Sequence, residues 1–222
     1  MEEAGNVLFS IGPLEVTGRV VTMWVIIALL ALVSWLATRN LKDVPGLLQN
    51  LAEMAVLKLR DFFTDNMGRE NARRYLPVMG TFFIFIIVSN YSGLLPGAGK
   101  LFAVPTSSLS VTAGLGIAAF FVTHYAGVRA RGVGGYLKSF LAPFFIMLPL
   151  NLIEQVVHPF SLALRLYGNI YGEETVTEQL GELFPILLPV IMQVMSLLFC
   201  LIQAVVFTML LSIYIGEAVG ED

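Results

Sequence analysis

The chain has 222 residues, of which 57% are hydrophobic and 13% are charged, and its mean hydropathy is +0.80. A soluble domain of this size needs more charge on its surface, so the composition excludes a soluble globular protein and predicts an integral membrane protein. The net charge of −3 carries little information, whereas the clustering of Lys and Arg in short segments predicts how the chain crosses the membrane.

The first long apolar run, about 20–37, predicts a membrane span. The N-terminus lacks the basic stretch that begins a secretory signal, so we expect this span to be retained. Acidic residues precede the span, and Arg39 and Lys42 follow it. The positive-inside rule then places the N-terminus outside and the loop around Arg39 in the cytoplasm.

The segment that follows Pro45 has a different pattern. Apolar residues recur at steps of three and four, whereas Asn50, Glu53 and Arg60 occupy the other side of a helix. This pattern predicts an amphipathic helix on the cytoplasmic membrane surface, or a tether that packs on other helices. The apolar positions are Leu48, Leu51, Ala55, Leu59 and Phe62.

Two further spans are predicted at about 75–95 and 109–128. The loop 96–105 between them carries only Lys100 and is expected outside, whereas the basic residues before and after the two spans are expected in the cytoplasm. These basic residues are Arg69, Arg73, Arg74, Arg129, Arg131 and Lys138.

Two longer apolar stretches, 140–172 and 183–215, complete the chain. As continuous helices each would be about 50 Å long, whereas the hydrocarbon core of a membrane is about 30 Å thick. We therefore expect these helices to tilt strongly or to bend. An acidic turn is expected between them, and it contains Glu173, Glu174, Glu178 and Glu182.

Arg165 is the residue that most constrains the function. From Ser139 to the C-terminus it is the only Lys or Arg, and it lies within the apolar segment PFSLALRL. A cation at the centre of an apolar helix costs about 3 kcal/mol or more, and arginine does not lose its proton. A buried carboxylate or a wet pathway must offset this cost, so the sequence predicts an ion-handling site.

Polar residues share one face of the predicted helix with Arg165, because at about 100° per residue they fall within about 40° of it. Glu174 falls on the opposite face and Glu173 to the side. The pattern predicts a helix that borders two wet spaces, although interhelical hydrogen bonds would explain His158 and Asn151 equally well. The aligned residues are Asn151, Glu154, His158, Asn169 and Gly172.

Two other pairs accompany the arginine. Gly168 and Gly172 form a small-xxx-small pair, which predicts the close approach of a partner helix. On the last helix Ser196 and Gln203 are one heptad apart and share a face. We expect Gln203 to hydrogen-bond Arg165 or a water chain, or to make a neutral interhelical contact.

The sequence predicts no cofactor and no metal. The single cysteine, Cys200, excludes a disulfide within the chain, and no paired cysteines or H-x-x-x-H spacing suggest a metal site. The segment 93–100 departs from the spacing of a phosphate-binding loop, so we expect no nucleotide site. The fold expected is an all-α integral membrane protein with one membrane domain. It comprises an N-terminal tail and first span (1–44), an amphipathic helix and basic loop (45–74), two spans (75–138) and a long tilted helical hairpin that carries the ion site (139–222).

The run PFSLALRLYGNIYGEE, which ends at Glu174, closely resembles subunit a of bacterial F-type ATP synthases. The earlier run PLNLIEQ and the late run LIQAVVF resemble the same family, as does the order of the predicted helices. The resemblance implies a membrane stator beside a rotating ring of c subunits. It also implies that Arg165 faces the ion-binding carboxylate of each c subunit.

The resemblance further implies roles for other residues. Asn169, Glu174 and Gln203 match positions of the external half-channel, and Glu154 matches a carboxylate near the cytoplasmic half-channel. Some members have His or Glu where this chain has Ser196. The additional carboxylate Glu173 is then expected to replace the missing polar group across the hairpin, and His158 and Asn151 are expected along the ion pathway.

The partners implied are the oligomeric c ring, the subunit b stalk, the soluble ATP-synthesising sector and membrane lipid, with no nucleic acid. The location implied is the bacterial plasma membrane, with several spans, the N-terminus outside and the C-terminus in the cytoplasm. The transported ion is H⁺ or Na⁺. A self-contained secondary transporter is the alternative, but it predicts internal repeats, and we find no convincing repeat. A purely structural scaffold leaves Arg165 unexplained.

Overall fold

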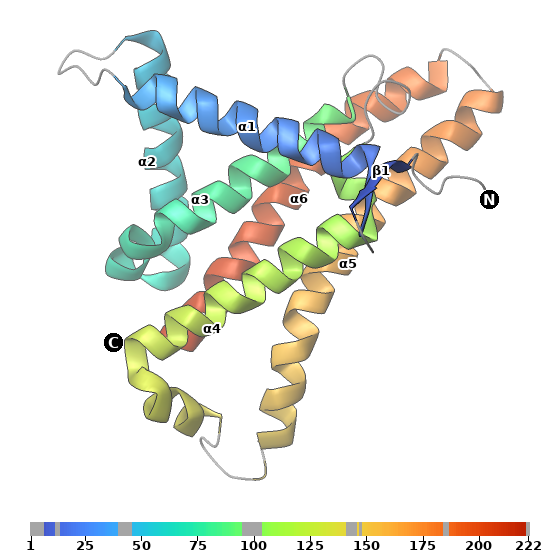
Figure 1. Cartoon of the computed structure of the whole chain (residues 1–222). Coiled ribbons are helices and arrows are strands. Elements are labelled where there is room, and N and C mark those ends of the chain that lie inside the picture. Colours follow the sequence, from blue (N-terminus) through green and yellow to red (C-terminus); the bar gives the residue numbers. More distant parts are fainter. Residues whose placement is uncertain are drawn as a thin grey trace.

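A computed structural model describes most of the chain, and its helices run in the order that the sequence predicts (Figure 1). The described residues are 7–11, 14–39, 46–94, 104–140, 146, 148–183 and 187–220. The helices are α1 (Gly18–Thr38), α2 (Leu47–Met67), α3 (Arg69–Ser92), α4 (Leu109–Ser139), α5 (Leu148–Leu183) and α6 (Leu187–Val219), with a 3₁₀ turn η1 at Pro105–Ser107. The predicted all-α membrane class is confirmed.

A short antiparallel hairpin precedes α1, which the sequence did not predict. Strands β1 (Val7–Ile11) and β2 (Leu14–Thr17) pair Ile11 with Leu14 and lie at the N-terminal end of α1 (Figure 1). These two strands are too short to build a sheet that could compete with the helical bundle. The hairpin therefore adds to the fold without changing its class.

Four helical segments are long and apolar enough to cross a membrane. They are Gly18–Thr38, Arg69–Leu94, Leu109–Ser139 and Val190–Val219. The predicted location in a membrane, with several spans, is therefore confirmed.

Single glycines at positive φ mark two boundaries that the sequence placed elsewhere. At Gly68 (φ 76°) α2 ends and α3 begins directly, so the basic residues Arg73 and Arg74 lie in the first turns of α3 and not in a loop. Gly132 (φ 72°) interrupts α4, whose yellow end turns sharply in Figure 1. Glycine adopts this backbone without steric cost, so a sharp bend needs no loop.

The expected acidic turn is helical instead. Helix α5 continues through Glu173 and Glu174 and ends at Leu183. Glutamate is a good helix former, and the chain meets no proline between Pro159 and Pro185 that would end the helix. The two carboxylates are therefore attached to a regular helix, two turns or more beyond Arg165.

Helix α6 is the centre of the bundle, packing on α2, α3, α4 and α5. Phe207, Leu211 and Ile215 are fully buried, and the Phe207 ring stacks on Phe82 of α3 with 5.9 Å between centroids. Helix α1 contributes only Ile26 to the buried core among the described residues. The apolar surface that α1 exposes suits lipid rather than water.

Helix α2 combines the two alternatives expected for it. Phe63 and Met67 near its end are buried in the core. Leu47, Leu51 and Met54 in its first half are exposed. The second half therefore acts as a tether, and the first half leaves apolar side chains available to a membrane surface.

The contact between α4 and α5 depends on Gly116. A Cβ there would lie 2.6 Å from the carbonyl oxygen of Pro159 and 3.2 Å from Cβ of Ala163. We expect Gly116→Ala to destabilise the protein by about 1–3 kcal/mol through overpacking, measured as a lower thermal midpoint in detergent. Gly114→Ala is the matched control, because a Cβ there meets nothing within 4 Å. Equal midpoints for the two variants would contradict this contact.

Candidate functional site

Arg165 lies on an exposed face of α5 because its neighbours bury the opposite face. Leu162 and Leu166 are 1% and 0% exposed in the core, so Arg165 points away from it. Phe160 and Leu164 beside it are exposed as well, at 64% and 43%. Within the described part of the chain, the guanidinium has no hydrogen bond or ion pair. Among the described residues, the cation therefore stands on a largely apolar surface without an ion pair.

Asn169, one helical turn beyond Arg165, pairs with α6. Its Nδ2 donates a hydrogen bond to Oε1 of Gln203 at 3.0 Å. Of the contacts expected for Gln203, the structure shows the neutral interhelical one and not a bond to Arg165. Gln203 is 3% exposed, and its Nε2 has no partner among the described residues. A buried donor of this kind is costly unless water satisfies it.

A cavity of about 250 Å³ opens between α5 and α6 beside this pair, and we call it the glycine cavity. A Cβ at Gly168 or Gly172 would meet nothing within 4 Å, so no other described helix approaches the small-xxx-small pair closely. The surface remains open to a partner. The lining residues are Gly168, Asn169, Gly172, Glu173, Val176, Met192 and Phe199.

The other residues predicted for the external half-channel, Glu173, Glu174 and Ser196, differ in their placement. Glu173 lines the glycine cavity, whereas the side chain of Glu174 is exposed. Ser196 is buried, and its hydroxyl donates to the carbonyl of Met192 on its own helix at 2.8 Å. Glu173 therefore places a carboxylate at the cavity, whereas the hydroxyl of Ser196 is occupied within its own helix.

Buried polar groups that the sequence analysis missed include Asn90 and Thr106. Asn90 is 2% exposed with both amide atoms unpaired, and the Thr106 hydroxyl is unpaired and fully buried, both among the described residues. A cluster of Tyr91, Val104, Ile170 and Cys200 joins the same elements. Unpaired buried groups are the sites at which internal water binds. The signal available in the sequence was their position beside the loop between two spans.

A second cavity, of about 190 Å³, lies nearer the other end of α5, and we call it the polar chamber. It brings together Asn151, Glu154 and His158, as the helical pattern predicts. Asn151 Nδ2 also donates to the carbonyl of Phe140 at 2.9 Å. The other lining residues are Thr123, Arg131, Tyr136, Ser139, Phe140, Gln155, Tyr214, Glu217 and Ala218.

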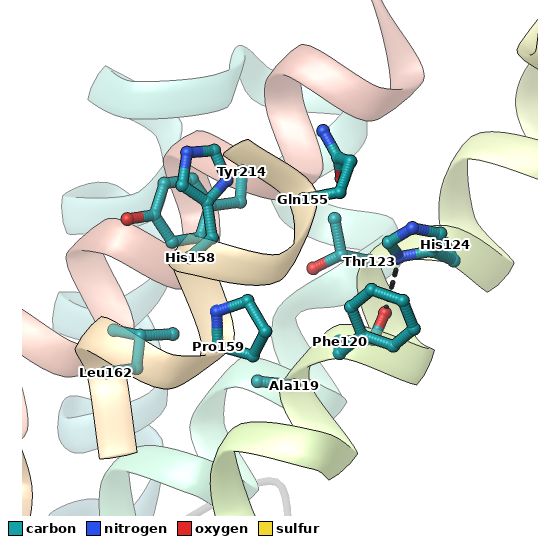
Figure 2. Close-up of a pocket in the computed structure, with 9 residues that line it drawn as sticks. All are labelled: Ala119, Phe120, Thr123, His124, Gln155, His158, Pro159, Leu162 and Tyr214. Carbon is teal, nitrogen blue, oxygen red and sulfur yellow. Dashed lines mark hydrogen bonds between the residues drawn. The ribbon is translucent and has the colours of Figure 1, made fainter. Parts of the chain in front are cut away.

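His158 borders both the polar chamber and a small cavity of about 10 Å³, which is drawn in Figure 2. Its ring stacks on Tyr214 of α6 with 4.0 Å between centroids and 3° between planes. His124 lies across the small cavity (Figure 2), and its Nδ1 donates to the carbonyl of Phe120 at 2.9 Å. A volume of this size has room for about one water molecule.

The structure thus places the glycine cavity and the polar chamber at different heights along α5, with Arg165 between them. His158 lies about two helical turns before the arginine, and Asn169 about one turn after it. Arg131, Tyr214 and Glu217 of the polar chamber were missed as site residues. In the sequence, Arg131 indicated only which end of its span faces the cytoplasm.

Comparison with known proteins gives one consistent result. A family model described as "ATP synthase A chain" matches residues 20–216. The chain is 42% identical over 215 residues to "ATP synthase subunit a 2" of Bradyrhizobium sp., covering 97% of this chain and 94% of the relative. It is 38% identical over 212 residues to "ATP synthase subunit a" of Moorella thermoacetica (96% and 95%). It is 40% identical over 213 residues to "ATP synthase subunit a 1" of Hahella chejuensis (96% and 88%).

The Asn169–Gln203 hydrogen bond generates a test of energetic coupling. We expect the variants Asn169→Leu and Gln203→Leu, measured singly and together by unfolding in detergent, to show a coupling of about 0.6 kcal/mol, typical of interhelical bonds in membranes. The control pair is Asn169→Leu with Gln193→Leu. Because Gln193 is exposed on α6, the two changes in unfolding free energy should add. Additivity in both pairs would contradict the bond.

Proposed function

The chain belongs to the ATP synthase A chain family, the ion-translocating stator subunits of F-type ATP synthases, and from this membership we propose that Arg165 is the cation at which each carboxylate of the rotating c ring releases its ion. The observation that supports the proposal is the exposure of Arg165 without a partner on an apolar face. A charge left unpaired in lipid costs several kcal/mol. A carboxylate supplied by another subunit offsets that cost.

The chemistry follows from the charge of the arginine. A carboxylate in lipid is stable when it is protonated or carries a neutralising cation. Beside Arg165 the ionised form is favoured, so the ion leaves. The carboxylate must bind an ion again before it returns to lipid, and Arg165 also repels ions that would pass directly between the two sides. Each unit charge that crosses contributes about 2.3 kcal/mol per 100 mV.

We assign the two cavities to two offset half-channels. The glycine cavity, with Asn169, Gln203 and Glu173 beside it, serves the external half-channel. The polar chamber, with Glu154 and His158, serves the cytoplasmic half-channel. Because the cavities lie on either side of Arg165 along α5, an ion that enters from one must travel around the ring to leave through the other.

The same proposal names the partners and the orientation. The exposed face around Arg165, Gly168 and Gly172 is the surface for the c ring, and the complex also contains the b stalk and the soluble ATP-synthesising sector. The chain lies in a bacterial plasma membrane with its N-terminus outside and its C-terminus in the cytoplasm, as the basic residues predict. The transported ion is H⁺ or Na⁺, and the chain itself needs no cofactor or metal.

We expect Arg165→Lys to abolish ATP-driven ion pumping by the assembled complex in reconstituted vesicles, although the charge is kept. Lysine lacks the planar fork of donors and loses its proton more readily when desolvated. Arg60→Lys is the matched control and should pump normally, because Arg60 pairs with Asp61 at the surface. Near-parental pumping by Arg165→Lys at equal assembly would disprove the role of this residue.

Orientation is tested by thiol labelling in a chain whose Cys200 is replaced by Ala. We expect Gly97→Cys, at a position outside the described residues, to react with an impermeant reagent from the external side only. Gly134→Cys should react from the cytoplasmic side only, and it is preferable to Gly132, whose positive φ disfavours a side chain. The reverse labelling pattern would invert the topology.

A further inference from the structure

Arg131 of α4 binds the C-terminal end of α6. Its Nε donates a hydrogen bond to the carbonyl of Val219 at 2.9 Å, and its Nη2 donates to the carbonyl of Glu217 at 3.1 Å. The last carbonyls of a helix have no partner within the helix, and a cation at that end interacts favourably with the helix dipole. One side chain therefore satisfies acceptors that would otherwise need water.

The backbone on both sides of this contact is adapted to it. Gly132, directly after Arg131, has φ 72° and turns the chain of α4 at this point. Gly220, directly after the last turn of α6, has φ 86°. A Cβ at Gly220 would fall against the guanidinium, 2.9 Å from Cζ and 3.0 Å from Nε of Arg131. A side chain at Gly220 would be strained by the positive φ and would displace the guanidinium of Arg131, so Gly220→Ala disrupts the contact.

The contact also forms part of the polar chamber. Arg131 lines the chamber together with Glu154 of α5 and with Tyr214 and Glu217 of α6. Tyr214 stacks on His158, so the last two turns of α6 form one wall of the space that His158 borders. Because Arg131 holds the end of that wall against α4, it sets the position of the polar groups of α6 relative to those of α5.

We propose that Arg131 is a positioning residue for ion exchange through the polar chamber, acting by clamping the end of α6 to the bend in α4. This inference rests on the proposed function, in which the chamber is the cytoplasmic half-channel. The clamp acts through position, because it fixes where Tyr214 and Glu217 of α6 lie relative to Glu154 in the chamber. A simple helix cap would affect stability alone, whereas the proposed residue affects one side of the membrane selectively.

The test compares Arg131→Met, Gly220→Ala and the double variant in the assembled complex in vesicles. ATP-driven pumping is measured against ion concentration on the chamber side, and ATP synthesis against ion concentration on the other side. We expect each single variant to raise the half-saturating concentration on the chamber side roughly tenfold, the effect of losing a charge-assisted hydrogen bond. If the ion is H⁺, the shift is about one pH unit toward acid. The other side should not change.

Two features separate the clamp from a general loss of structure. The double variant should shift no further than either single variant, because both changes break the same contact. Arg131→Lys keeps a donor that can reach the last carbonyls of α6 and should restore part of the affinity. Gly134→Ala is the matched control in the same bend, where a Cβ meets nothing within 4 Å, and it should behave as the parent.

Equal shifts on the two sides, additive shifts in the double variant, or parental values in Gly220→Ala would each overturn the inference. If Arg131→Met does not assemble, Gly220→Ala and Arg131→Lys still decide between the outcomes. The proposed function fails separately, through normal pumping by Arg165→Lys. A chain that needs Arg165 but pumps with parental half-saturation after the loss of the Arg131 contact would therefore disprove only the clamp.

Discussion

The structure depends on one charge, that of Arg165, which forms no ion pair with any described residue. An arginine side chain is a permanent cation, and the burial of Leu162 and Leu166 turns Arg165 outward from the core. The other residues of the described chain supply no carboxylate to it. In the proposed function the carboxylate belongs to a moving partner, whereas a fixed ion pair would hold the arginine permanently.

Helix α6 lines both cavities. Its buried residues Phe207, Leu211 and Ile215 hold it at the centre of the bundle, while Gln203 and Tyr214 turn toward α5 and meet Asn169 and His158. The same helix therefore contributes to the glycine cavity side and to the polar chamber. A rigid central helix keeps the two cavities at constant heights along α5, as the proposed function needs.

Local sequence patterns predicted the helices better than the connections between them. Apolar runs located α1, α3, α4 and α6, because a membrane requires each spanning segment to satisfy its own backbone. The connections were less predictable. Between α2 and α3 a single glycine at positive φ, Gly68, takes the place of the expected loop. Similarly, Glu173 and Glu174 suggested a turn by their polarity, but their helix propensity and the distance to Pro185 extended α5.

The sequence by itself determined the membrane class, the two long C-terminal helices and the isolation of Arg165 in an apolar segment, because length, apolar periodicity and an isolated cation are local properties. It also grouped Asn151, Glu154 and His158 on one helical face. The tertiary structure alone decided which helix faces meet. The Asn169–Gln203 bond and the contact of Arg131 with Val219 join residues that are far apart in the chain, and their register depends on how whole helices pack, which no local pattern contains.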